Sequence, residues 1–338
     1  MTAPREFGAA TRSGAIEPGV GTVAPASPPV LPRTLRILVC RTISALLIRH
    51  PFPGANRLRR RLADLLMPAP QGPVVVQTIM GCSLLVDPLV NKGLEREVYY
   101  HGAYEVGTMY VLSNVLRPGD TFLDVGANIG LVTLVASQLV GRQGRVYAFE
   151  PVAGTIAILE RNIALNDARN VCIKASALGA VDETRPVYEH LKVNRGAASF
   201  VPIGDASSSA IVPVTTLDTF VHSAGLEGPI RAIKIDVEGW ESQVLAGGRQ
   251  LLADSAAPVL VVEYSTKVRL PKGAHTDLYD LIRSLNEYRL FCLERGKEVI
   301  SRLREIHRPE DLPREDNLIC LLPMHLQETR VRALLKGG

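Results

Sequence analysis

Residues 123–130 read Leu-Asp-Val-Gly-Ala-Asn-Ile-Gly, in which an apolar strand ends, the chain turns and an apolar helix begins. Gly126 permits a turn geometry that a Cβ atom would obstruct, and Gly130 is expected to let the helix pack closely on the strand. The first amides of the helix are expected to face the crevice beyond the strand's carboxyl end, the usual ligand site of an α/β sheet. This segment therefore predicts a ligand-binding loop in an α/β fold.

The spacing of the loop narrows the choice of ligand. It reads D-x-G-x-N-x-G and lacks the second glycine of the dinucleotide fingerprint G-x-G-x-x-G, which argues against a nicotinamide cofactor. The next predicted strand ends at Glu150, whose carboxylate could accept two hydrogen bonds from a ribose diol, and Pro151 then starts a helix. A carboxylate at a strand end is also a common helix cap. The distance in the sequence between the glycine loop and Glu150 favours an adenosine ligand.

From Pro118 onward, short apolar runs alternate with longer amphipathic ones, which is typical of a parallel sheet covered by helices. Strands are predicted at Thr121–Val125, Arg145–Glu150, Val171–Ala175, Ile230–Asp236 and Pro258–Tyr264. Helices are predicted at Ile129–Leu139, Val152–Asn166, Trp240–Leu252 and His275–Asn286. Two last β-rich runs, Tyr288–Leu293 and Asn317–Leu322, are expected to close the sheet as an antiparallel pair, and residues 181–214 suggest an inserted hairpin.

The chain has 338 residues, 46% of them hydrophobic, which suffices for one large domain or two small ones. Residues 1–34 are rich in Gly, Ala, Pro, Ser and Thr and are expected to form a disordered tail. The other predicted parts are a basic segment of two short helices at 35–70, a hairpin and helix cap at 71–117, the α/β domain at 118–325 and a tail at 326–338. The hairpin is expected at Val74–Val86, and helix at Leu94–Leu116 with a break near Gly102.

The net charge of +4 is unevenly distributed. Residues 1–67 contain ten arginines, no lysine and three acidic residues, a balance of +7 that leaves −3 for the rest of the chain. This pattern is compatible with peripheral contact between residues 35–67 and acidic lipid, and equally with a solvated helix face. No aromatic residues that could stack on bases are interleaved with the arginines at 57–61, and no nucleic-acid partner is predicted.

No apolar run reaches the roughly 18–20 residues that a membrane-spanning helix needs, and residues 1–32 lack the pattern of a secretion signal. The five cysteines are far apart and form no Cys-x-x-Cys pair, which argues against a disulfide framework and a structural zinc site. We therefore expect a cytoplasmic protein, with a peripheral place at the membrane left open.

A second polar cluster lies in residues 233–241, Ile-Lys-Ile-Asp-Val-Glu-Gly-Trp-Glu. Lys234 and Asp236 are two residues apart and share one face of a predicted central strand, where an unpaired ammonium would be very costly. One interpretation is an ion pair that fixes the strand. The other places Asp236, Glu238 and Lys234 at a reaction centre, where one of them accepts a proton.

Glu263, at the end of the next predicted core strand, should face the same crevice, although a helix cap or a surface position fits equally well. Mg²⁺ bound by these acids remains open but is not predicted, because no second cluster at a strand end supplies the other ligands.

Four segments together resemble the FkbM family of S-adenosylmethionine-dependent methyltransferases. They read Tyr104-Glu105, Phe122-Leu123-Asp124-Val125-Gly126-Ala127-Asn128-Ile129-Gly130, Ala148-Phe149-Glu150-Pro151 and Ile233-Lys234-Ile235-Asp236-Val237-Glu238-Gly239. The resemblance spans about Leu94 to Tyr264. Asn128 stands where the wider methyltransferase motif has its middle glycine, as is usual in the FkbM branch. The implied fold is a Rossmann-like class I methyltransferase, α/β, with a mostly parallel, doubly wound, seven-stranded sheet and an antiparallel final strand.

The resemblance also implies S-adenosylmethionine as cofactor and a hydroxyl of a small molecule, such as a sugar, glycolipid or polyketide-like product, as acceptor. The implied cofactor-binding residues are Glu105, Asp124, Gly126, Ala127, Asn128, Gly130, Glu150, Pro151, Ser176, Ala177 and Asp236. The catalytic candidates are Asp236, Glu238, Lys234 and Glu263, and no metal ligand is assigned. From spacing alone, Glu105 fits a helix surface equally well.

A competing hypothesis is a scaffold that binds the cofactor without catalysis and acts through its basic N-terminal helices. The joint presence of the glycine loop and the acidic strand ends argues against it. The sequence pattern makes no prediction of oligomeric state.

Overall fold

The computed structural model describes residues 32–50, 52, 54–188, 199–200, 208–226, 228–266 and 274–336. The predicted tail at 1–34 therefore lies outside the described residues up to position 31, and helix α1 already begins at Arg33. All the elements below belong to one unit, Arg33–Gly338.

The N-terminal elements follow the predicted breaks in the sequence. They are α1 (Arg33–Arg49), α2 (Ala55–Leu66), the antiparallel hairpin of β1 (Val74–Gln77) and β2 (Ser83–Val86), α3 (Leu94–His101) and α4 (Val106–Val115). Gly102 ends α3 with φ of 66°, a left-handed conformation that glycine adopts without a steric penalty.

The central sheet has eight strands in the order β12-β11-β13-β10-β9-β3-β4-β5. Their bounds are β3 (Thr121–Val125), β4 (Arg145–Phe149), β5 (Val171–Lys174), β9 (Ile230–Ile235), β10 (Val259–Ser265), β11 (Arg289–Leu293), β12 (Leu303–Ile306) and β13 (Glu315–Leu321). The five strands from β10 to β5 run parallel, and β13 lies antiparallel between β10 and β11. The Rossmann-like fold class is thus confirmed.

The sheet differs from the prediction by one strand. The short edge strand β12 makes it eight-stranded instead of seven-stranded. Its sequence, Leu303-Arg-Glu-Ile306, is half charged and only four residues long, so it carries no strong strand pattern. It pairs antiparallel with β11.

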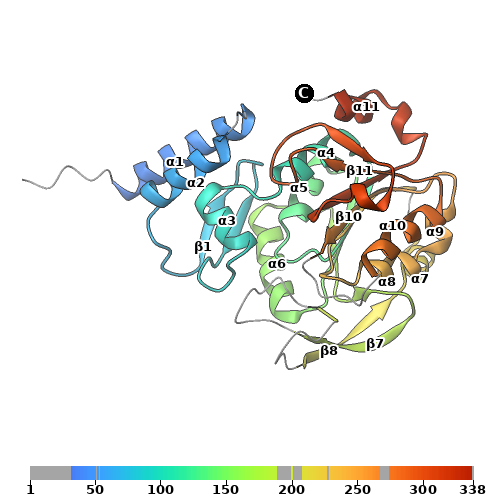
Figure 1. Cartoon of the computed structure of the whole chain (residues 1–338). Coiled ribbons are helices and arrows are strands. Elements are labelled where there is room, and N and C mark those ends of the chain that lie inside the picture. Colours follow the sequence, from blue (N-terminus) through green and yellow to red (C-terminus); the bar gives the residue numbers. More distant parts are fainter. Residues whose placement is uncertain are drawn as a thin grey trace, which may run out of the picture. The chain divides into compact units, whose positions relative to one another are not determined.

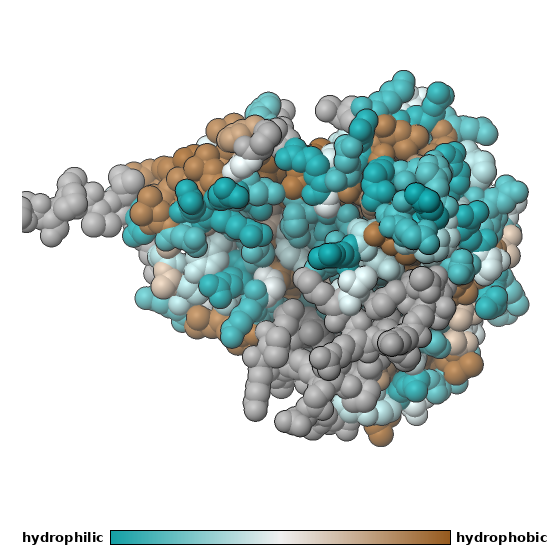
Figure 2. All heavy atoms as spheres, in the orientation of Figure 1, coloured by the Kyte–Doolittle hydropathy of each residue, from teal (hydrophilic) through white to brown (hydrophobic). Residues whose placement is uncertain are grey.

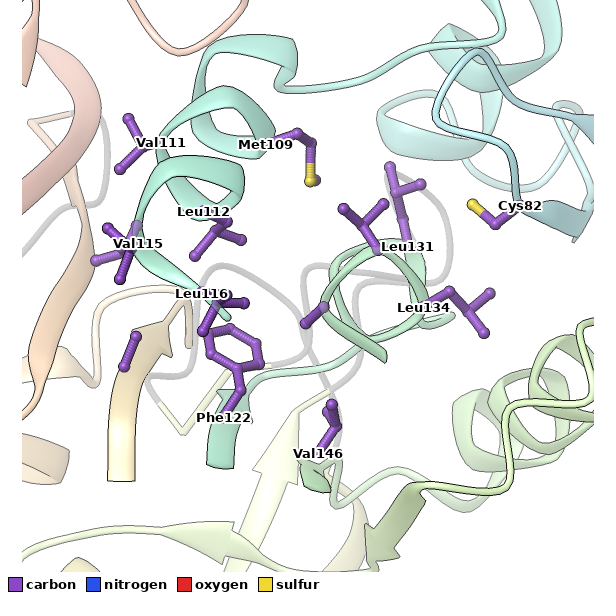
Figure 3. Packing of buried hydrophobic residues seen from close by; sticks show 14 of the residues in the cluster. Cys82, Met109, Val111, Leu112, Val115, Leu116, Phe122, Leu131, Leu134 and Val146 are labelled. Atoms are coloured by element: carbon purple, nitrogen blue, oxygen red, sulfur yellow. The ribbon is translucent and has the colours of Figure 1, made fainter. Parts of the chain in front are cut away.

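Helices cover both faces of the sheet (Figure 1). One face carries α4, α5 (Leu131–Val140) and α11 (Thr329–Lys336), and the other carries α7 (Leu217–Ser223), α8 (Glu241–Ala246), α9 (Arg249–Ala253) and α10 (Ala274–Leu285). Strand alternation separates the two cores, because Phe122 belongs to the first and its neighbour Leu123 to the second. Figure 3 shows Phe122 and Val146 of the sheet beneath leucines of α4 and α5.

Two expectations about helices were wrong. The single helix predicted at Trp240–Leu252 is divided into α8 and α9 at Gly247, where a Cβ atom would lie 2.0 Å from the carbonyl oxygen of Gly179. Residues 326–338, predicted as a tail, contain α11, whose Val331 and Leu334 are buried in the first core.

The inserted hairpin expected within 181–214 is formed by β7 (Glu183–Tyr188) and β8 (Ser208–Thr215), which pair antiparallel. With β6 (Ala177–Leu178) they make a small second sheet. The remaining elements are α6 (Ala153–Leu165) and two short 3₁₀ turns at Pro309–Asp311 and His325–Gln327. Within the described residues, no helix has both the length and the apolar character needed to cross a bilayer.

Candidate active site

A pocket of about 1130 Å³ opens beyond the carboxyl ends of β3, β4, β9 and β10. This is the crevice that the glycine loop predicted. Its lining contains five carboxyl side chains and one ammonium group, namely Glu105, Glu150, Asp236, Glu238, Glu263 and Lys234. Of the predicted cofactor residues, Gly126, Ala127, Asn128, Pro151 and Ala177 also line it. A lining so rich in carboxylates favours a ligand that carries positive charge.

The glycine loop packs closely against the backbone at the end of β9. A Cβ atom on Gly126 would lie 1.9 Å from the carbonyl oxygen of Asp236, so this position requires glycine. A Cβ atom on Gly130 would meet the end of the Leu159 side chain of α6 at 2.4 Å and not the strand, and the φ of 93° at this position favours glycine, so the expected reason for that glycine is corrected.

The amides of the glycine loop bond to the end of β4 and to the residue that follows it. Gly126 and Ala127 donate their N–H groups to the carbonyl of Phe149, and Asn128 donates its N–H to Glu150. These hydrogen bonds connect the loop after β3 to the loop after β4 at the edge of the pocket.

Asn162, on α6, is a positioning residue that sequence reasoning missed. Its side chain accepts a hydrogen bond from the N–H of Leu85 and donates to the carbonyl of Ile129, at 2.6 and 2.8 Å. It thereby ties the β1–β2 hairpin to the glycine loop. An asparagine in the middle of an amphipathic helix gives no signal of this role in the sequence.

Glu150 serves as a cap and faces the pocket at the same time. One carboxylate oxygen accepts the N–H of Val152 at the start of α6, and the other accepts the N–H of Asn128, each at 3.0 Å. Glu150 is 7% exposed and lines the pocket. Each carboxylate oxygen can accept a second hydrogen bond, so the two interpretations from the sequence are compatible.

Three of the predicted cofactor residues, Asp124, Gly130 and Ser176, do not line the pocket. The carboxylate of Asp124 lies behind the loop, fully buried, and accepts a hydrogen bond from the hydroxyl of Thr133 at 2.6 Å. Burial raises the pKa of Asp124, although the charge of Lys234 opposes the shift. In this arrangement Asp124 supports the loop from the interior.

Lys234 forms the ion pair that the strand pattern required. Its ammonium is 3% exposed and contacts the carboxylate of Asp236 at 2.5 Å. Burial disfavours both charges, but their attraction raises the pKa of Lys234 and holds that of Asp236 well below its usual range. Ile233 and Ile235 face the opposite core, as the alternation predicted.

Lys297, in the turn after β11, is the charged residue that sequence reasoning missed. Its ammonium contacts Glu105 at 2.8 Å and Glu263 at 3.1 Å, and all three side chains are largely buried. The neighbouring Glu298 accepts the backbone N–H of Glu105, while Asn317 donates to the Glu105 carboxylate at 2.9 Å. Lys297 thus joins the start of α4 to the end of β10.

Glu238 is the pocket carboxyl best matched to proton transfer near neutral pH. Burial, followed by repulsion from Asp236 and Glu241, raises the pKa of Glu238 to about 7. Glu241 also has its pKa raised to about 7, mainly by burial, but it accepts the N–H groups of Val237 and Gly239 in the turn before α8 and does not line the pocket.

Three pocket residues hold a strained backbone. Glu105, Asn128 and Glu238 have φ values of 46°, 50° and 51°, in the left-handed region that non-glycine residues seldom adopt. Among the described residues only one other non-glycine, Asp167, has positive φ. Such strain commonly gathers at functional sites. Asparagine tolerates this conformation better than most residues, which gives a physical reason for Asn128 at a glycine position.

Carboxylate oxygens of Asp236, Glu238 and Glu263 lie within 4.8 Å of one another, a spacing that a divalent cation could bridge. Glu263 thus lies in the crevice shared with Asp236 and Glu238, where its position at the end of a core strand predicted it. However, the ammonium groups of Lys234 and Lys297 already contact two of these carboxylates and supply positive charge. The ion pairs therefore account for the cluster without a metal.

An aromatic wall completes the pocket. Trp240 packs against Phe200 with ring centroids 5.2 Å apart, and the Arg185 guanidinium lies over the indole at 4.7 Å. Two buried polar atoms of the lining, Asn128 Oδ1 and Trp240 Nε1, have no hydrogen-bond partner among the described residues. An acceptor and a donor are thus left for a ligand to satisfy.

One family model matches half of the chain. Residues 124–296 match the model of the methyltransferase FkbM domain. The chain is 24% identical over 172 residues to methyltransferase 1 of Beauveria bassiana, a match covering 46% of this chain, and 26% identical over 182 residues to methyltransferase sdnD of Sordaria araneosa, covering 45%. Each match covers 66% of the fungal protein, so the chain spans just under two thirds of these relatives.

Solved structures that align with the chain include a SAM-dependent methyltransferase from Agrobacterium tumefaciens, with a TM-score of 0.39 and 12% identity over 76% of this chain and 72% of that one. Another is Aeropyrum pernix fibrillarin in complex with S-adenosylmethionine, with a TM-score of 0.39 and 13% identity over 75% of this chain and 94% of that one.

Proposed function

Because the chain belongs to the FkbM family of S-adenosylmethionine-dependent methyltransferases, we propose that it transfers a methyl group to a hydroxyl oxygen of a small molecule. A sugar, glycolipid or polyketide-like product is the acceptor class. The family match supports methyl transfer, and the pocket chemistry supports oxygen as the acceptor atom. The observation that carries the choice of oxygen is the carboxyl group of Glu238, with its pKa raised to about 7 inside the pocket.

The pocket fits the cofactor in charge and in hydrogen-bonding capacity. S-adenosylmethionine supplies a methyl group on a positively charged sulfur. The acidic lining favours that charge, the carboxylate of Glu150 in the pocket wall suits a ribose diol, and Asn128 Oδ1 and Trp240 Nε1 have no hydrogen-bond partner among the described residues.

The three strand-end carboxyls have different roles in this proposal. A hydroxyl loses its proton as its oxygen becomes bonded to carbon, and a base with a pKa near the working pH accepts that proton best. Glu238 meets this condition. Asp236 is stabilised as an anion by Lys234, and burial together with the charge of Asp236 raises the pKa of Glu263 well above its ordinary value. We therefore assign Glu238 as the base and the other two to orientation of the hydroxyl.

The acceptor class and the bond formed can be tested together. Purified protein is incubated with isotopically methyl-labelled S-adenosylmethionine and a panel of sugars, glycolipids and polyketide-like alcohols, and products are analysed by mass spectrometry and NMR. We expect a labelled methyl ether on one class. A product labelled only on nitrogen or carbon would contradict the choice of oxygen, while methyl transfer itself would stand.

Replacing Glu150 by alanine should weaken the binding of S-adenosylmethionine and S-adenosylhomocysteine by about tenfold to a hundredfold, the usual value of hydrogen bonds to a charged group. Isothermal titration calorimetry measures the change. Glu160→Ala, at an exposed position of α6, is the matched control and should bind normally. Undiminished affinity in the Glu150→Ala variant would remove the ribose assignment.

A further inference from the structure

The hairpin of α1 and α2 exposes an unusual number of large apolar side chains. Of the thirteen exposed large hydrophobic residues among those described, six lie between positions 35 and 65. They are Leu35, Leu38, Leu46, Phe52, Leu58 and Leu65, with exposures from 40% to 71%. In Figure 2, brown side chains gather over these two helices, with teal ones beside them. A soluble surface has no need of such a cluster.

The helical spacing places these side chains on outward faces. Leu35, Leu38 and Leu46 recur at intervals that keep them on one side of α1, and Leu58 and Leu65 lie two turns apart on α2. The inward side of α2 carries different residues: Ala55, Arg59 and Ala63 are buried. The exposed leucines are therefore additional to the residues that attach the hairpin to the rest of the fold.

The same hairpin is strongly basic. Residues 33–66 contain eight arginines and one acidic residue, Asp64. Arg57, Arg60 and Arg61 are exposed, and none of them forms an ion pair with a described residue. At helical spacing Arg57, Arg60 and Arg61 lie together beside Leu58 and Leu65, so guanidinium groups border the apolar side chains along one edge.

We propose that this basic apolar face, made of the six exposed apolar residues with Arg57, Arg60 and Arg61, binds the surface of an anionic lipid bilayer. Leucines and a phenylalanine enter the boundary between headgroups and acyl chains, while the arginines contact the phosphates. Neither helix is long and apolar enough to cross the bilayer, so both lie in its plane.

The charge of the hairpin disfavours a second copy of the chain as the occupant. A twofold dimer places the same patch on both subunits, so two strongly positive surfaces would face each other. An anionic bilayer has the complementary charge and also accepts the apolar side chains.

Sedimentation of the full chain with lipid vesicles tests the proposal without any need for methyl transfer. The probes are vesicles of phosphatidylcholine alone and of phosphatidylcholine mixed with phosphatidylglycerol. We expect binding to the mixed vesicles that is stronger by roughly tenfold or more and that weakens with salt. The triple variant Arg57→Gln/Arg60→Gln/Arg61→Gln should lower the partition coefficient by roughly a hundredfold. Leu38→Ser/Leu65→Ser should lower it by roughly tenfold or more.

Matched controls lie elsewhere on the surface. Ile211→Ser removes a more exposed apolar side chain from β8, and Arg142→Gln/Arg169→Gln removes two exposed arginines outside the hairpin. Both should bind vesicles like the parent, and circular dichroism confirms that each variant is folded. The proposal is overturned if the folded parent binds neither vesicle, or if it binds both equally. It is also overturned if controls and hairpin variants behave alike, or if the parent is a stable dimer that Leu38→Ser/Leu65→Ser converts to monomer.

Discussion

Replacing Glu238 by glutamine is expected to lower the turnover number by about 10²- to 10⁴-fold, the usual contribution of a positioned general base. Glutamine keeps the size of the side chain but cannot accept the proton of the hydroxyl. Affinity for S-adenosylmethionine should change little, because a neutral side chain replaces a carboxyl that is already partly protonated near neutral pH. Steady-state kinetics with the acceptor found in the panel, together with calorimetry, measure the two quantities.

The pH dependence of turnover tests Glu238 as the base more specifically than the loss of turnover in the variant does. Glu238 accepts a proton only when ionised, so turnover should rise as the pH passes through about 7 and level off above it. In Glu238→Gln the residual rate should lose this rise. Glu241→Gln is the matched control, because this carboxyl also has a pKa of about 7 but binds the turn before α8 and does not line the pocket. A pH rise that persists in Glu238→Gln and disappears in Glu241→Gln would exclude Glu238 as the base.

Lys297→Met should destabilise the protein by about 3–5 kcal/mol, the usual result of removing one partner from a buried ion pair. The ammonium contacts Glu105 and Glu263, whose side chains are 2% and 13% exposed, so its removal leaves two buried carboxyls without a direct cation. The start of α4 and the end of β10 lose their connection. Urea unfolding followed by circular dichroism gives the free energy.

Arg302→Met is the control for this variant. Arg302 pairs with Glu294 on the surface, where both side chains are at least two-fifths exposed, and water replaces the lost contact. Its unfolding curve should nearly coincide with that of the parent. If Lys297→Met also coincided with the parent, the bridge would have no part in holding α4 to the sheet.

The parts of the fold that the sequence predicted are those determined by the pattern of apolar and polar residues within a single element. Strand β3 matches its predicted bounds, and Ile233 and Ile235 face the core opposite to Lys234, because alternation along a strand is visible in its own residues. The division of α8 from α9 falls at Gly247 and Gly248, a pair of glycines that is visible in the sequence and was given too little weight. Helix α11 was missed because only two of its residues are buried.

At the pocket, too, the features that follow from the local sequence were predicted, and those that depend on contacts between distant elements were not. Glu150 and the acidic end of β9 lie there because parallel strands bring their carboxyl ends to one edge of the sheet. The sequence could not show that Asp124 supports the loop from behind, since that depends on Thr133 in the following helix. Nor could it identify Lys297, because its partners Glu105 and Glu263 come from distant elements.

The place of β13 limits how far the chain can be shortened. The match to the family model ends at residue 296, but β13 comes later in the chain and lies inside the sheet, with six of its seven residues buried. A fragment ending at the family boundary would leave β10 with an unpaired, apolar edge. Unpaired apolar edges recruit other chains, so such a fragment is expected to precipitate during expression. The smallest autonomous folding unit therefore extends beyond Leu321.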